Sequence, residues 1–85
     1  MTSNDVLERI SAIVAEVGVL PVGEVAPEKF FADDLDIDSL GMVEISATVE
    51  DSLGVSIPDE ELAELATVGA LVDYVSARAV TAAAG

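Results

Sequence analysis

The sequence contains no cysteine and no histidine. Without cysteine the chain forms no disulfide and offers no thiol of its own. Nucleophilic catalysis by a serine would need a positioned base, which is usually histidine, and the chain has no histidine. It has no cysteine nucleophile either. Carboxylates are plentiful, but a domain of this size has little room for a pocket that would separate their pKa values. We therefore expect the protein not to be an enzyme.

Basic residues are nearly as scarce, with three Lys and Arg against 17 Asp and Glu, which gives a net charge of −14. Such a field repels nucleic acid and anionic membranes and attracts basic patches on other proteins. The sequence shows no signal-peptide pattern at its start and no apolar run of membrane-spanning length. We expect a cytoplasmic, monomeric protein that binds neither nucleic acid nor membrane.

Aromatic residues make up only 4% of the chain, whereas 52% of its residues are hydrophobic. The core is therefore expected to be aliphatic. A chain of 85 residues forms one small domain, close to the size at which a single core is just adequate.

Apolar residues recur at helical spacing in three long segments, of which the first two are described here and the third follows Thr67. The pattern predicts helices over about residues 4–17 and 38–53, which Gly18 and Gly54 are expected to end. A long first loop, residues 18–37, joins them and is pinned by its own apolar residues. These are Val25, Phe30, Phe31, Leu35 and Ile37, and core packing is the expected role of both phenylalanines.

Two further helices follow the second. A short one begins with Pro58, and Thr67 caps a longer one that follows. The expected fold class is all-α, a small antiparallel bundle with three main helices, one short helix and a long first loop. Residues 1–80 form the domain, and residues 81–85 are expected to be a frayed tail.

An acidic stretch stands where the second long helix begins. Because a helix start needs only one side-chain cap, Asp38 in that role would leave the hydroxyl of Ser39 free. The four acids of this stretch are Asp33, Asp34, Asp36 and Asp38. Their spacing from Asp34 matches the start of an EF-hand loop, but the sixth position is Ser39 instead of Gly and the twelfth is Ile45 instead of Glu. We expect no dedicated metal site, although loose divalent binding to the clustered acids stays open.

The second long helix has two apolar stripes on opposite sides. One stripe, which is expected to face the core, consists of Met42, Ile45, Val49 and Leu53. The other, an apolar strip edged by acids, indicates a docking surface for basic partners. It consists of Leu40, Val43 and Ala47, flanked by Glu44, Glu50 and Asp51.

These residues carry a family resemblance. The sequence resembles acyl carrier proteins in Asp38-Ser39-Leu40 and the preceding Asp33-Asp34-Leu35, and the likeness continues in order and spacing through most of the chain. The further matching blocks are Met42-Val43-Glu44-Ile45, Glu50-Asp51, Gly54-Val55, Ile57-Pro58-Asp59-Glu60 and Thr67-Val68-Gly69. The likeness is greatest to carriers of dissociated fatty-acid synthases, the meromycolate-extension branch among them. Gly41 departs from the polar or acidic residue that is common there.

The resemblance implies a function and a cofactor. It implies that 4′-phosphopantetheine is esterified to Ser39, flanked by Asp38 and Leu40, and carries growing acyl chains as thioesters to fatty-acid synthesis enzymes. Partner enzymes and the phosphopantetheinyl transferase would present basic patches to Asp34 and to the docking surface. The acyl chain would fold back between the helices, lined by Ile45, Val49 and Ile57.

Two alternatives remain open. A carrier for polyketide assembly would share these motifs, whereas peptidyl carriers typically show Gly-Gly-x-Ser and are disfavoured. An acidic helical adaptor without a prosthetic group would use Ser39 only as a residue of the first turn.

Overall fold

The computed structural model describes the backbone of residues 3–84 and the side chains of residues 4–78. In this range the chain forms helices only, and its extended segments pair once, in an isolated bridge between Phe30 and Thr67. The elements are α1 (Ser3–Gly18), the 3₁₀ turn η1 (Val22–Glu24), α2 (Ser39–Leu53), α3 (Asp59–Leu62) and α4 (Val68–Ala84). The predicted all-α fold with three main helices and one short helix is confirmed.

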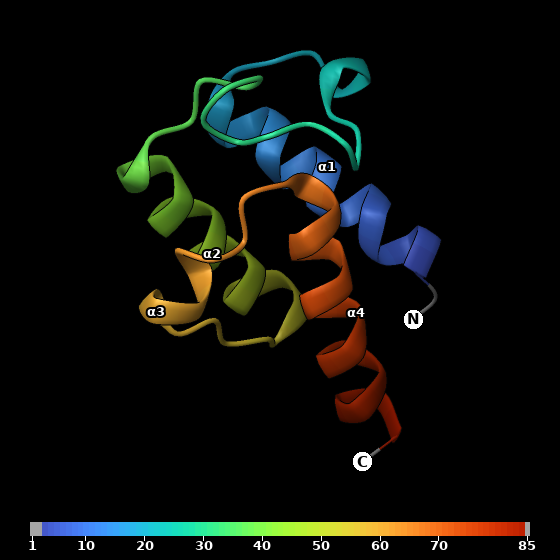
Figure 1. Ribbon diagram of the computed structural model, residues 1–85. Coiled ribbons are helices and arrows are strands. Elements are labelled where there is room, and N and C mark those ends of the chain that lie inside the picture. Colours follow the sequence, from blue (N-terminus) through green and yellow to red (C-terminus); the bar gives the residue numbers. More distant parts are fainter. Residues whose placement is uncertain (1–2, 85) are drawn as a thin grey trace.

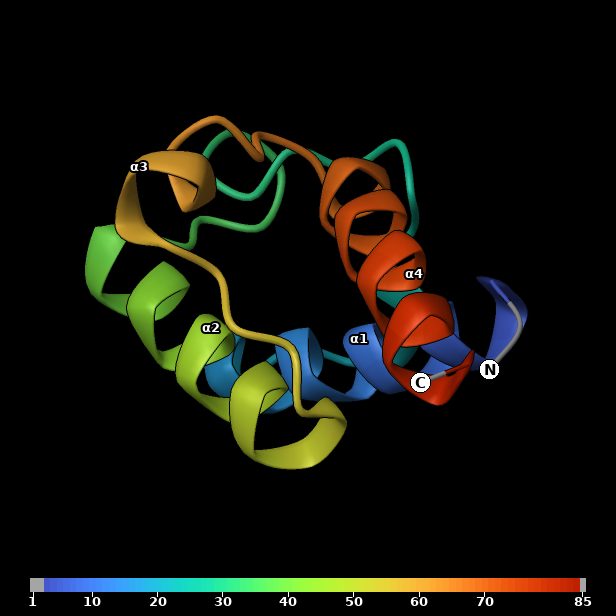
Figure 2. The same ribbon diagram turned by 90° about the horizontal axis from the view of Figure 1, so that it is seen from below.

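The three long helices pack around one core (Figure 1). α1 runs toward the end of the molecule that the long loop covers, whereas α2 and α4 run away from that end. α1 contacts both α2 and α4, and the short α3 contacts α2 (Figures 1 and 2). The core is aliphatic except for Phe31, as the composition predicts. Its fully buried side chains are Val6, Ile10, Val14, Ile45, Val49, Val68, Leu71 and Val75.

The long first loop is fastened to the segment that precedes α4. Three backbone N–H groups donate across this junction: Phe31 to the carbonyl of Ala66 at 3.0 Å, Val68 to Lys29 at 3.0 Å, and Gly69 to Pro27 at 2.8 Å. A Cβ at Gly69 would lie 2.9 Å from the Pro27 carbonyl oxygen, so only glycine permits this approach. The loop is therefore a fixed layer over one end of the bundle.

The loop's apolar residues behave as predicted with one exception. Val25, Phe31, Leu35 and Ile37 are buried, but Phe30 is 46% exposed. The prediction of a core role for Phe30 was wrong. Neighbours in an extended segment point to opposite sides, so the burial of Phe31 turns Phe30 outward.

Most predicted helix ends are correct. Gly54 closes α2 in the left-handed region at φ 70°, and the Thr67 Oγ1 accepts from the N–H of Ala70 at 3.1 Å in the first turn of α4. Pro58 stands one position earlier than predicted, immediately before α3. α4 continues to Ala84, beyond residue 80, and fraying of residues 81–85 stays a prediction.

The end of α1 differs from the prediction by one residue. Gly18 is its last helical residue, and the left-handed position falls on Val19 at φ 54°. The N–H of Leu20 donates to the carbonyl of Ala15 at 2.9 Å and that of Val19 to Glu16 at 3.4 Å, which is a Schellman ending. A β-branched residue is strained in this conformation.

We expect Val19→Gly to stabilise the fold by about 0.5–1 kcal/mol, because it relieves strain that exceeds the added freedom of the unfolded chain. The Val19 side chain is 88% exposed, so little packing is lost. Thermal melting measures the effect. Val22→Gly, at an exposed valine without positive φ, should lower stability instead. Equal shifts in the two variants would contradict the strain argument.

Candidate functional site

The start of α2 is capped as the sequence predicts. The Asp38 Oδ1 accepts from the N–H of Gly41 at 2.9 Å, and the Asp38 carbonyl accepts the first helical N–H, that of Met42, at 3.0 Å. Ser39 is therefore the first helical residue. It is exposed, and its hydroxyl makes no hydrogen bond to any residue that the structure describes. This hydroxyl is free to be modified.

A cavity of about 480 Å³ opens directly beside Ser39. Three separate segments of the chain form its walls: the end of the first loop, the first turns of α2, and α3 with the residues that follow it. The lining is mostly apolar and consists of Phe31, Ala32, Ile37, Asp38, Ser39, Met42, Val43, Asp59, Leu62, Ala63, Leu65 and Ala66. A group attached to Ser39 would thus stand between solvent and an apolar space.

The residues predicted to line an acyl pocket lie elsewhere. Ile45, Val49 and Ile57 are buried in the core, and none of them borders this cavity. The family resemblance implied these three residues, and no pattern in the sequence could identify the walls that the loop and α3 provide. A lining role for these three residues in an acylated protein stays a prediction.

The predicted docking residues of α2 are accessible. Leu40 is 75% and Val43 is 50% exposed, and Ala47 is exposed beside them. The flanking acids Glu44, Glu50 and Asp51 are exposed too. These six residues are called the α2 docking face below.

Asp34, the remaining predicted partner contact, is exposed but has a structural role as well. Its Oδ2 accepts from the N–H of Phe30 at 2.8 Å and thereby closes a turn of the first loop. Its exposure leaves the predicted role as a partner contact as a prediction.

The structure explains why a glycine occupies position 41, which the sequence did not reveal. A Cβ at this position would lie 2.6 Å from the Cγ2 of Ile37 and 3.6 Å from the Asp38 Oδ1. The Ile37 methyl group is fixed to a branched, buried side chain and cannot easily move away. Gly41 therefore lets the end of the loop pack against the first turn of α2.

We expect Gly41→Ala to lower the free energy of unfolding by about 1 kcal/mol. Alanine gains about 1 kcal/mol of helix propensity over glycine, but overpacking against Ile37 costs about 1–3 kcal/mol. Urea denaturation measures the difference. Gly23→Ala is the matched control, because no atom lies within 4 Å of its added Cβ. A stabilised Gly41→Ala would mean that Ile37 can repack freely.

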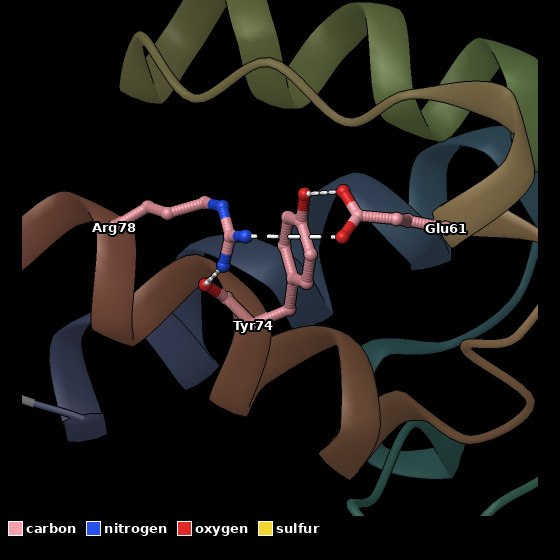
Figure 3. Close-up of polar contacts among 3 residues, drawn as sticks. All are labelled: Glu61, Tyr74 and Arg78. Carbon is pink, nitrogen blue, oxygen red and sulfur yellow. Dashed lines mark hydrogen bonds and ion pairs between the residues drawn. The ribbon is translucent and has the colours of Figure 1, made fainter.

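A polar cluster joins α3 to α4, and the sequence did not predict it (Figure 3). The Tyr74 hydroxyl donates to the Glu61 Oε2, and the Arg78 guanidinium lies 3.6 Å from the centroid of the Tyr74 ring. Arg78 Nη2 is 4.0 Å from Glu61 Oε1, and Arg78 Nη1 donates to the Tyr74 carbonyl at 3.5 Å. The spacing of Tyr74 and Arg78, at i and i+4 of one helix, could have predicted the contact between these two side chains. It could not have predicted Glu61, which lies 13 residues before Tyr74 on another helix.

The hydrogen bond to Glu61 raises the pKa of Tyr74 above its ordinary value of 10.0, while the charge of Arg78 opposes the shift. The folded protein thus favours the protonated phenol. The resulting stabilisation is fully present below the unfolded pKa and is lost as the pH rises through the folded pKa. In an ultraviolet titration, Tyr74 should ionise at lower pH in Glu61→Gln than in the wild type. Identical midpoints would contradict the role of Glu61.

Among the described residues, no group of three or more His, Cys, Asp and Glu side chains is arranged to hold a metal ion. The helices described here also include none that is long and apolar enough to cross a membrane.

Comparison with known proteins gives one consistent family. Residues 8–75 match the family described as Phosphopantetheine attachment site. An acyl carrier protein of Acidothermus cellulolyticus is 44% identical over 82 residues, which cover 96% of this chain and 98% of that protein. A meromycolate extension acyl carrier protein of Mycobacterium leprae is 51% identical over 75 residues, covering 88% of this chain but only 65% of that protein's length.

A solved structure agrees with the sequence relatives. An acyl carrier protein from Enterococcus faecalis superposes with a TM-score of 0.75 at 32% identity, and the match covers 91% of this chain and 98% of that one. The family match and these relatives agree with the exposed serine at the start of α2 and the cavity beside it. The chain belongs to the acyl carrier proteins, which carry a phosphopantetheine attachment site and act as carriers instead of catalysts.

Proposed function

We propose that this protein holds growing acyl chains as thioesters on 4′-phosphopantetheine attached to Ser39 and presents them to enzymes of fatty-acid synthesis. The observation that carries the proposal is the position of Ser39. Its hydroxyl is exposed, has no partner among the described residues, and borders an apolar cavity. Bound there, the prosthetic group supplies the thiol that this chain lacks.

The residues around Ser39 suit a phosphodiester. The N–H groups of Ser39 and Leu40 precede the first intrahelical hydrogen bond, that of Met42, and the helix dipole also favours an anion at this end. The negative charge of Asp38 opposes an anion, but its carboxylate is turned to the N–H of Gly41. Asp38 therefore contributes by fixing the helix start from which Ser39 projects.

The exposed α2 docking face supports a further part of the proposal. Its apolar strip would contact partner enzymes while its acids meet basic patches on fatty-acid synthesis enzymes and on the phosphopantetheinyl transferase. Charge complementarity of this kind mainly raises the association rate and the specificity, which suits a carrier that must leave each partner quickly. A cytoplasmic, monomeric protein is part of this proposal.

Among fatty-acid pathways, meromycolate extension is the branch that we favour. The supporting observation is the 51% identity to the mycobacterial carrier. Because the chain spans 65% of that protein's length, the acyl chains and enzymes of this branch are assigned here as a proposal.

Intact-mass measurement tests the proposal directly. The purified protein is incubated with coenzyme A, Mg²⁺ and a phosphopantetheinyl transferase, and it should gain the mass of one phosphopantetheine group. A fatty-acid synthase transacylase should then add an acyl group to the new thiol. An adaptor without prosthetic group would keep its mass. Loading by polyketide enzymes alone would reassign the pathway but keep the carrier role.

A further inference from the structure

The wall of the cavity that faces α2 is a single short segment. Five of the lining residues lie between 59 and 66, in α3 and in the turn that follows it: Asp59, Leu62, Ala63, Leu65 and Ala66. The other walls are the core-anchored first loop and α2. The width of the space beside Ser39 therefore depends on where this one segment stands.

α3 is too short to be stable by itself, and it depends on contacts with the rest of the protein. It has four residues, no side-chain cap at its start, and a length at which an isolated helix does not form in water. Its three acids, Asp59, Glu60 and Glu61, add to the charge of a chain that already carries −14. Self-repulsion of this kind favours moving α3 outward. The buried side chain of Leu62 holds the side of α3 that faces the cavity. Resistance to outward movement needs a second contact on the opposite side of α3.

The cluster of Glu61, Tyr74 and Arg78 is that second contact (Figure 3). Glu61 does not line the cavity, and it points from α3 to Tyr74 and Arg78 on α4. Arg78 is one of only three cationic residues in the sequence, and it lies beside Glu61, one of the three acids of α3. The cluster thus fastens α3 from outside the cavity.

We propose that Glu61 and Tyr74 are positioning residues that determine how long an acyl chain this carrier shelters. The inference rests on the proposed function. A short chain fits the cavity without moving its wall, whereas a long chain must push α3 outward. Outward movement breaks the bond between Tyr74 and Glu61, so the cluster opposes the sheltering of long chains while leaving short chains unaffected.

The first test uses the protein without a prosthetic group. The N–H groups of Leu62 and Ala63 donate within α3 to Pro58 at 2.9 Å and Asp59 at 3.1 Å, and their hydrogen exchange reports its opening. In Tyr74→Phe this exchange should become about tenfold faster, while the amides in the middle of α2 keep their rates. Unchanged exchange at Leu62 and Ala63 would overturn the proposal.

Glu64→Gln is the matched control for Glu61→Gln. Both remove one acid from the same wall, but Glu64 is exposed and lies outside the cluster. Glu61→Gln should speed exchange less than Tyr74→Phe, because the amide still accepts from the hydroxyl. Glu64→Gln should leave exchange unchanged or slower, because it relieves repulsion. If Glu64→Gln speeds exchange as much as Glu61→Gln, the cluster has no special role.

The second test compares chain lengths. Hexanoyl and hexadecanoyl forms are prepared, and the rate of thioester cleavage by hydroxylamine is measured for the wild type and Tyr74→Phe. The ratio of the hexadecanoyl to the hexanoyl rate should fall at least about threefold in the variant. A merely destabilised variant would instead expose both thioesters by the same factor, which would overturn the proposal. Failure of the wild type to accept the prosthetic group would refute the proposed function and the chain-length role with it, whereas the exchange test would still decide whether the cluster holds α3.

Discussion

Ser39→Ala is expected to abolish phosphopantetheine loading while the fold is unchanged. The variant removes the only atom to which we assign the attachment, so the loss should be at least about a thousandfold and not a partial decrease. Stability should change by no more than about 0.5 kcal/mol, because the side chain is exposed and contributes no hydrogen bond to the described residues. The cap of α2 is retained, since it comes from Asp38.

Ser52→Ala is the control for this experiment. Ser52 is also an exposed serine of α2, but it lies in the last turn of the helix and does not line the cavity. It should load as the wild type does. Intact mass after incubation with coenzyme A and transferase gives loading, and circular dichroism melting gives stability. A mass gain in Ser39→Ala would place the attachment on another residue, and a loss in Ser52→Ala would show that loading responds to substitutions in α2 in general.

The sequence predicted the elements well where the signal is local. Asp38 and Gly54 bound α2 as expected, because capping and left-handed closure depend on residues within one turn. The burial of Ile45 and Val49 and the exposure of Leu40 and Val43 follow equally from helical periodicity. Ser39 was identified by its place at this helix start and by the family motif.

The cavity could not be predicted in this way. Its walls come from the first loop, α2 and α3, and no periodic pattern within one helix states which segments meet. The family resemblance implied an acyl lining of Ile45, Val49 and Ile57, which stays a prediction. The space beside Ser39 is bordered instead by residues such as Phe31, Met42 and Leu62. Tertiary packing alone decides this.

Two local details also depended on distant or unusual geometry. Gly41 looked like a weakness of the helix, but it is required by the close approach of Ile37. Val19 occupies a left-handed position that sequence rules would give to Gly18. At Gly41 the packing of Ile37 offsets the lost helix propensity, whereas the exposed Val19 side chain has little packing to offset its strain.

Charge reversal on the α2 docking face is expected to weaken transfer to and from partner enzymes. Glu44 is exposed next to Val43, so Glu44→Lys places a cation where a basic partner would approach. We expect the kcat/KM of the transferase and of a fatty-acid synthase enzyme to fall about tenfold at low ionic strength, mainly through slower association. The defect should shrink at high salt, because screening over about 10 Å at 0.1 M weakens the wild-type attraction as well.

Glu8→Lys separates a specific face from a general acidic field. Glu8 is exposed on α1, and its reversal changes the net charge by the same amount as Glu44→Lys. If partners are guided to the α2 docking face, Glu8→Lys should lower kcat/KM by less than about twofold at about 0.1 M salt. At this ionic strength the Debye length is about 10 Å, so exposed charges farther than that from the contact are largely screened. Truncation of Leu40 to alanine should instead speed dissociation and show little salt dependence, because apolar contact governs how long a complex lasts. Equal defects in Glu8→Lys and Glu44→Lys with both enzymes would mean that the partners respond to the total charge of −14, and α2 would then have no privileged part in docking.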